Sequence, residues 1–171
     1  VNYVSNSSDV LNVAHNLPSE PRLIFFKDRD NTTNWFVYHN DGSTGMMFEG
    51  LNTTAAGTTN LAALNNTKPN SHSITLNSGG YTVNPSGNHN MLAYCWSEVS
   101  GYSKFGSYES ADPADVTVTL GFRPRWVLIK SADYSSSTTS WMIYDSARLG
   151  DSTMTNALIA NKPTGQAYRG D

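Results

Sequence analysis

Four polar side chains stand where apolar runs end, in positions that suit contact with a ligand. His39 and Asp41 close one such run, and Asp145 and Arg148 close another run later in the chain. Loops at the ends of strands are where a β-sandwich usually carries its binding residues. These four residues are therefore the candidates for glycan contact.

A second candidate site is a short acidic stretch. Asp28, Asp30 and Asn31 place two carboxylates and an amide close together, which is a set of oxygen ligands that suits calcium. The stretch lacks the glycine and the distal glutamate of an EF-hand loop. A solvated turn is the favoured interpretation, with a weak calcium site as the alternative. No other cofactor is expected.

The sequence gives little support for catalysis. Residues 101–106 miss the Gly-x-Ser-x-Gly nucleophile elbow by one position, and no strand-to-helix context surrounds them. The histidines are scattered without metal-ligand spacing. No pattern points to the paired carboxylates of a glycosidase. Cys95, the single cysteine, lies in an apolar run and is expected to be a small core residue.

Two similar stretches organise the chain. Residues 21–27 and 124–130 share a proline, an arginine, an apolar run and a lysine at an offset of 103 residues. Each is followed by an aromatic run whose tryptophan and tyrosine recur at an offset of 106, as Trp35 with Tyr38 and Trp141 with Tyr144. Recurrence of this length predicts one architectural unit used twice. Core packing is the favoured role for these four aromatic residues, and sugar stacking is the alternative.

The units are expected at residues 1–105 and 106–171, the second being shorter and packing with the first, or completing one continuous sandwich with it. Turn signals and apolar runs predict strands at 10–13, 23–27, 35–39, 46–48, 74–77, 79–83, 91–99, 116–119, 126–130 and 141–145. A single helical turn is expected at 61–64, and no strand is expected after residue 149. Trp126 and Trp141 are expected to be buried. Many short strands without helical periodicity predict an all-β antiparallel sandwich.

Composition narrows the function classes. The chain has 171 residues, a formal net charge of −3 and only 15% charged residues. No basic stripe is present to neutralise phosphates, which argues against nucleic-acid binding. No apolar run is long enough to predict membrane insertion. A surface rich in uncharged polar residues suits an extracellular β-protein.

With these motifs assembled, the chain resembles a repeat of virion proteins from tailed bacteriophages, especially marine ones. The matching stretches are 13–17, 21–27, 35–39, 51–54, 93–98, 101–108, 121–130 and 144–148. The resemblance implies a concanavalin/laminin-G-like jelly roll in a tail fibre, head fibre or similar appendage. It also implies a location on the virion surface, and it supplies no catalytic residues. In that family the second unit continues into a closing hairpin, which this sequence is not expected to contain.

The sequence thus predicts a non-enzymatic virion surface protein that forms part of a fibre or decoration, or binds host-surface polysaccharide, or both. Its expected partners are other copies of itself, other virion proteins and host polysaccharide. The alternative is a carbohydrate-active enzyme of the same fold. In the second unit the strand at 126–130 would have an open edge. We expect a strand from a neighbouring chain to fill that edge, or residues 91–99 to serve both halves.

Overall fold

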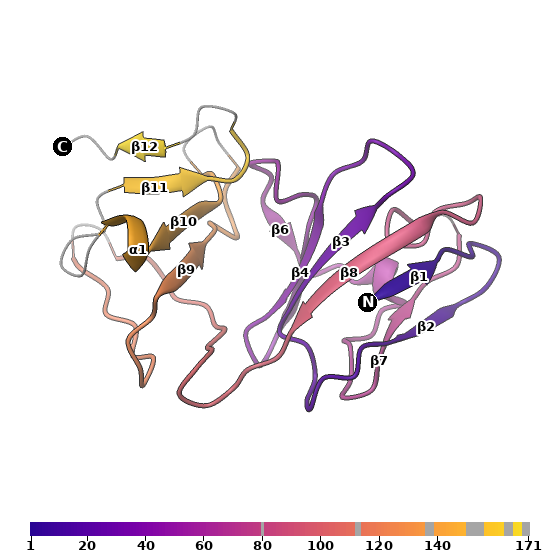
Figure 1. The fold of residues 1–171 in the computed structure, drawn as a ribbon, viewed down its shortest axis with the longest axis horizontal. Coiled ribbons are helices and arrows are strands. Elements are labelled where there is room, and N and C mark those ends of the chain that lie inside the picture. The colour runs from indigo at the N-terminus through magenta and orange to yellow at the C-terminus, as the bar shows by residue number, and fades with distance from the viewer. Residues whose placement is uncertain (80, 112–113, 136–138, 150–155, 163–165, 169–171) are drawn as a thin grey trace.

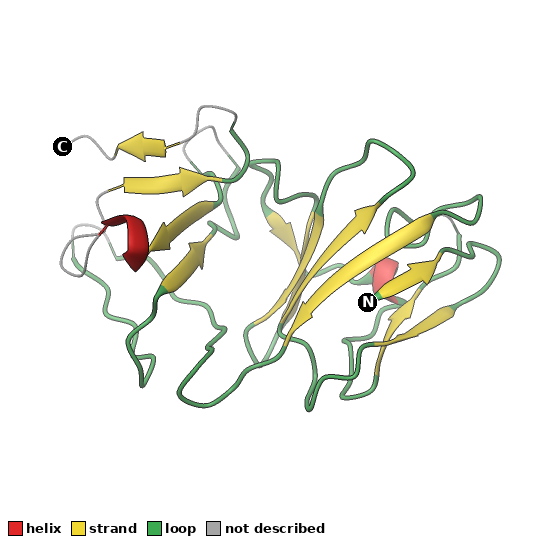
Figure 2. Cartoon of the chain, in the orientation of Figure 1, coloured by secondary structure: helices red, strands yellow, loops and turns green. Residues whose placement is uncertain are grey.

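The structure, a computed structural model, describes residues 1–79, 81–111, 114–135, 139–149, 156–162 and 166–168. Strands dominate these residues (Figure 2). Helix in this part of the chain is confined to the 3-10 turn η1 (Ala62–Leu64), where a helical turn was expected, and to α1 (Ser146–Leu149). The described strands pair antiparallel throughout. The prediction of a mostly β, antiparallel protein with almost no helix is confirmed.

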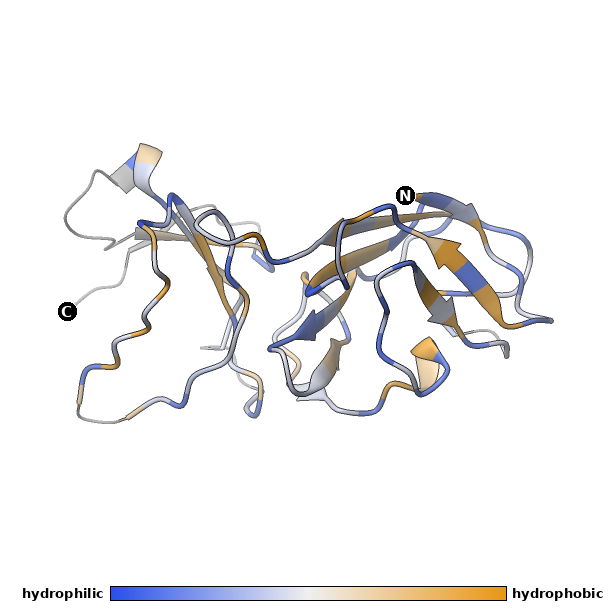
Figure 3. Cartoon of the chain, turned by 90° about the horizontal axis from the view of Figure 1, so that it is seen from below, coloured by the Kyte–Doolittle hydropathy of each residue, from blue (hydrophilic) through white to orange (hydrophobic). Residues whose placement is uncertain are grey.

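A six-stranded sheet forms the centre of the molecule (Figure 1). Its strands, in spatial order, are β1 (Asn2–Val4), β8 (Asn90–Trp96), β3 (Leu23–Asp28), β4 (Phe36–Asn40), β5 (Gly45–Phe48) and β6 (Gly57–Thr58). On strand β3 the inner-face residues Ile24 and Phe26 are buried, whereas Phe25 and Lys27 on its outer face are half-buried. Figure 3 shows the hydrophobic residues mainly on strands and the hydrophilic residues mainly in connections.

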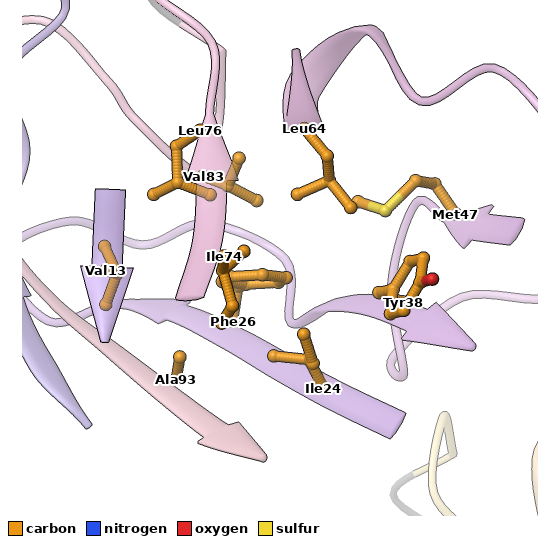
Figure 4. Close-up of a cluster of buried hydrophobic side chains, with 10 residues drawn as sticks. All are labelled: Val13, Ile24, Phe26, Tyr38, Met47, Leu64, Ile74, Leu76, Val83 and Ala93. Atoms are coloured by element: carbon orange, nitrogen blue, oxygen red, sulfur yellow. The ribbon is translucent and has the colours of Figure 1, made fainter. Parts of the chain in front are cut away.

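The inner face of this sheet carries the main core. A two-stranded sheet of β2 (Leu11–Ala14) and β7 (Ser73–Leu76) packs over it. Figure 4 shows Ile74 of β7 against Phe26 of β3, with Leu64 and Met47 beside Tyr38. Ile74 and Tyr38 have no exposed surface, and Phe26 is 2% exposed. Burying side chains of this size stabilises a fold by roughly 1.5–3 kcal/mol each, which makes this cluster the main source of stability.

The outer face of the same sheet is covered at one end only. A second sheet, in the order β12 (Gln166–Tyr168), β11 (Asn156–Ile159), β10 (Met142–Asp145) and β9 (Trp126–Ile129), lies beside the β6 edge (Figure 1). Trp141 joins the two sheets, because its ring packs edge-on against Phe48 at 5.1 Å and its Nε1–H donates to the Gly50 carbonyl at 2.9 Å. A second contact is the hydrogen bond from Gly57 N–H to the Ala132 carbonyl at 2.7 Å.

Several sequence expectations were wrong. Trp126 is 52% exposed, because no element covers its side of β9 in the described residues, whereas Trp141 is 3% exposed as predicted. Residues 116–119 form no strand. The expected hairpin of 74–77 with 79–83 is not seen in its described residues, which leave out residue 80, since β7 pairs with β2 instead. Strands β11 and β12 form after residue 149, where none was expected. The division of the chain near residue 105 stays a prediction.

Candidate ligand-binding surface

The outer face of the six-stranded sheet changes from covered to open across its width. Val37 on β4 has no exposed surface, and Phe48 on β5 is 5% exposed beneath the second sheet. On β8 the same face carries Tyr94 and Trp96, which are 45% and 40% exposed. An open apolar area on an otherwise packed face is a typical interaction surface.

Three aromatic side chains, Trp35, Tyr94 and Trp96, form a row on this open area. Residues two apart on a strand point to the same face, which places Tyr94 and Trp96 side by side on β8. Their rings lie 6.2 Å apart with a 24° interplanar angle, and the rings of Trp35 and Tyr94 lie 6.4 Å apart at 17°. The rings of this aromatic row are therefore nearly parallel and stand in sequence along one surface.

Phe25 on the neighbouring strand β3 braces the row. It is the cross-strand partner of Tyr94, and its ring meets Trp96 edge-on at 5.0 Å with a 67° interplanar angle. Edge-on contacts of this kind are favourable for aromatic rings. Trp96 is thus held on one side by Phe25 and on another by Tyr94, while two-fifths of its surface faces solvent. The binding face needs little ordering before a ligand arrives.

The charged groups nearest this surface along the chain are held by local partners. The Lys27 ammonium donates to the Thr33 carbonyl at 2.8 Å. Glu98, which follows Trp96 by two residues, accepts from Lys104 at 2.9 Å, and this hydrogen bond keeps the pKa of Glu98 below its ordinary value. The Glu98–Lys104 pair contributes little net field, and Lys27 is held by an uncharged carbonyl, so the row itself offers mainly aromatic contact.

The sequence candidates His39 and Asp41 are not part of the row. His39 shares its outer face, but β3 lies between the two, since Leu23 pairs with His39 on one side and with Trp96 on the other. His39 is half-buried on the outer face of β4, and burial lowers its pKa. Asp41 accepts from the backbone N–H groups of Ser43 and Thr44, both at 2.8 Å, and from the Ser107 hydroxyl at 2.8 Å. The two backbone hydrogen bonds are the largest cause of its lowered pKa. Asp41 therefore shapes the turn after β4.

Asp145 and Arg148 lie together at the start of α1. The Arg148 backbone N–H donates to Asp145 Oδ1 at 2.9 Å, and the Arg148 Nε–H donates to Oδ2. The side-chain hydrogen bond from Arg148 is the main reason that the pKa of Asp145 is lowered. This ion pair caps a single helical turn. Asp41 thus holds the turn after β4 and the Ser107 hydroxyl, whereas Asp145 holds the start of α1, so the two carboxylates have separate partners.

The acidic stretch is fully engaged in loop contacts. Asp28 is 3% exposed, accepts from the Asp30 N–H at 2.9 Å, and pairs with His89 Nδ1 at 2.7 Å. Asp30 accepts from the Asn90 N–H at 2.7 Å, and Asn31 donates to Asp28. Among the residues that are described, no group of three or more His, Cys, Asp or Glu side chains is placed to hold a metal ion. The carboxylates join the loop after β3 to the start of β8.

One family model matches residues 1–170 of the chain, that of a domain of unknown function, DUF7483. The chain belongs to the DUF7483 family. No curated protein and no solved structure matches it. Within the described ranges, no helix of this DUF7483 domain has the length and apolar character needed to cross a membrane.

The sequence of this DUF7483 domain pointed to Trp35, with sugar stacking as the alternative to core packing, but not to Tyr94 and Trp96. The apolar run at residues 91–99 was interpreted as a buried strand. A usable signal was present. Small residues, Ala93 and Cys95, alternate there with the two large aromatic residues. The small residues face the inner core, where Ala93 is fully buried, and the large ones face outward. Burial raises the pKa of the inward Cys95 thiol to about 11, which fits a packing role.

Proposed function

We propose that the DUF7483 domain is a non-catalytic attachment module of a tailed-bacteriophage particle, located in a fibre or surface decoration. In this proposal it binds a polysaccharide of the host surface through the aromatic row. The observation that carries the proposal is the exposure of Tyr94 and Trp96 beside Trp35, in nearly parallel order on a rigid sheet.

Aromatic faces contact two common classes of biological polymer, nucleic-acid bases and sugar rings. Single-stranded nucleic acid requires a positive groove alongside the stacking rings. Among the described cations close to the row along the chain, Lys27 is held by the Thr33 carbonyl, Lys104 by Glu98 and Arg22 by Glu20. The C–H face of a sugar ring packs on an aromatic ring without any counter-charge. The row therefore favours a carbohydrate whose binding depends on stacking.

Stacking on two or three rings gives a weak single site. An appendage that displays many copies converts weak sites into strong attachment, because each bound site raises the effective concentration at the next. The resemblance of the sequence to phage appendage repeats supports this setting. The contacts of Asp28, Asp41 and Glu98 support a non-catalytic role, because each carboxylate is spent on a local structural bond.

The test is retention of the 171-residue protein in affinity gels that contain cellulose, chitin, xylan, starch or bacterial cell-envelope polysaccharide. The double variant Tyr94→Ala/Trp96→Ala should lose at least tenfold in affinity for the polysaccharide that retains the wild type. The matched control is Trp126→Ala, which removes an even more exposed tryptophan on the second sheet and should bind like the wild type.

A second variant tests whether binding depends on the aromatic row or on the four residues that the sequence predicted. Alanine at His39, Asp41, Asp145 and Arg148 together should leave retention within about twofold. Loss in this variant with full retention in the row variant would move the site to the strand-end loops. Shortening of any of these polysaccharides by the purified protein would favour the carbohydrate-active enzyme instead. Free migration of the wild type in every gel would refute glycan attachment.

A further inference from the structure

The two central hairpins of the molecule pair in the same register. Each cross-strand pair of β3–β4 has a counterpart in β9–β10 at the offsets of the sequence recurrence. In β3–β4 the pairs are Leu23–His39, Ile24–Tyr38, Phe25–Val37 and Phe26–Phe36. In β9–β10 they are, in the same order, Trp126–Asp145, Val127–Tyr144, Leu128–Ile143 and Ile129–Met142. The two hairpins differ in their neighbours. Strand β3 has β8 on its other side along its whole length, whereas β9 is the edge strand of its sheet in the part of the chain that is described.

Burial follows this difference. Ile24 and Phe26 of β3 are at most 2% exposed, while their counterparts Val127 and Ile129 are only half-buried. Strand β8 pairs with β3 on one edge and, over Asn90–Leu92, with β1 on the other, and it lies in a different sheet from β9. Residues 91–99 therefore do not complete both halves among the described strands, contrary to one of the two expectations. An open strand edge next to an incompletely covered apolar face is a site for strand addition.

The chain also contains a strand-like segment without a partner. Residues 116–120 read Val-Thr-Val-Thr-Leu, an alternation of β-formers that suits a strand. Val116 and Val118 are 41% and 50% exposed. The segment forms no strand, and no backbone hydrogen bond joins it to another described element. One molecule therefore carries both an unpaired β-segment and an unpaired strand edge.

We propose that the free edge of β9 pairs with residues 116–120 of a second copy of this chain. Because every copy has both parts, each one can donate a segment and accept one, and reciprocal exchange between two copies gives a closed two-fold dimer as the smallest form. The added strand would place Val116, Val118 and Leu120 on one face, where they extend the apolar row of Val127 and Ile129. This interface is separate from the aromatic row, and the inference does not depend on glycan binding.

Sedimentation velocity of the 171-residue protein, from about 1 to about 100 μM, tests this proposal. We expect the wild type to assemble. Val118→Pro should raise the dissociation constant at least tenfold, since proline removes a backbone donor and disrupts strand pairing. Val118→Thr keeps the N–H and the β-branch and should assemble within about threefold of the wild type. Because Val118 is half exposed, all three proteins should give the same near-ultraviolet circular dichroism.

A wild type that stays monomeric over the whole range would overturn the proposal. Equal assembly of Val118→Pro and the wild type would also overturn it, and would move the interface to another edge such as β1 or β6. Val10→Pro is a further control, because Val10 is a similarly exposed valine that lies just before β2, away from the proposed interface, and this variant should assemble normally if it folds.

Discussion

The two ends of one sheet face carry the same kind of aromatic pair in different surroundings. Phe48 and Trp141 meet edge-on at 5.1 Å and 71°, and Phe25 and Trp96 meet edge-on at 5.0 Å and 67°. Trp141 is 3% exposed and its indole N–H is hydrogen-bonded, whereas Trp96 is 40% exposed. The Phe48–Trp141 pair thus connects the two sheets at one end, whereas the Phe25–Trp96 pair, with similar ring geometry, stays partly exposed at the other. The covering element, rather than the residue type, decides between the two roles.

The largest expected effect is at the covered end. Trp141→Ala should lower the free energy of unfolding by roughly 3–5 kcal/mol, because it removes a buried aromatic side chain together with its indole hydrogen bond to the Gly50 carbonyl. Chemical denaturation measures the loss. Trp126→Ala serves as the control and should change stability by less than about 1 kcal/mol. Equal losses in the two variants would show that the second sheet is covered on both faces in solution.

The next largest effect on stability is expected at Asp28, which holds the loop between β3 and Trp35. Burial by itself raises the pKa of Asp28, but hydrogen bonds from His89, from the Asp30 N–H and from Asn31 outweigh it, so the pKa lies below its ordinary value. A carboxylate of this kind stabilises the fold above the pKa it has when unfolded, about 4, and the stabilisation is lost as the pH falls through the lower folded value.

Asp28→Asn should therefore destabilise the protein by roughly 1–3 kcal/mol at pH 7, because it removes the charge that accepts these bonds. The difference from the wild type should shrink as the pH falls below about 4. Urea midpoints measured between pH 7 and pH 2.5 give both quantities. A difference that does not change with pH would show that the ionised form of Asp28 is not what stabilises the loop.

The smallest expected effect on stability is at the open end. Trp96→Ala should change the free energy of unfolding by no more than about 1 kcal/mol, because much of this side chain already faces solvent. Thermal unfolding of Trp96→Ala beside Trp141→Ala makes the comparison direct. A loss at Trp96 as large as that at Trp141 would mean that the open end is covered in solution and belongs to the core.

Local signals in the sequence were enough for part of this structure. The apolar run before Asp28 predicted strand β3, and the aromatic residue after the long loop predicted the buried Trp141. The recurrence between the two halves of the sequence wrongly predicted that Trp126 is buried. Burial depends on which element covers the strand, and the sequence pattern alone does not show that element. Tyr94 and Trp96 were missed for the same reason. Alternation shows which residues share a face, but only packing shows which part of that face stays open.

The most direct test of the open surface is iodide quenching of tryptophan fluorescence in Trp126→Phe, with and without the polysaccharide that retains the protein. In this variant Trp141 is buried, so the quenchable signal comes from the two tryptophans of the row, Trp35 and Trp96. The account predicts that bound polysaccharide shields them and lowers the quenching constant at least twofold. Saturating polysaccharide that leaves the quenching constant unchanged would contradict the assignment of the aromatic row as the binding surface.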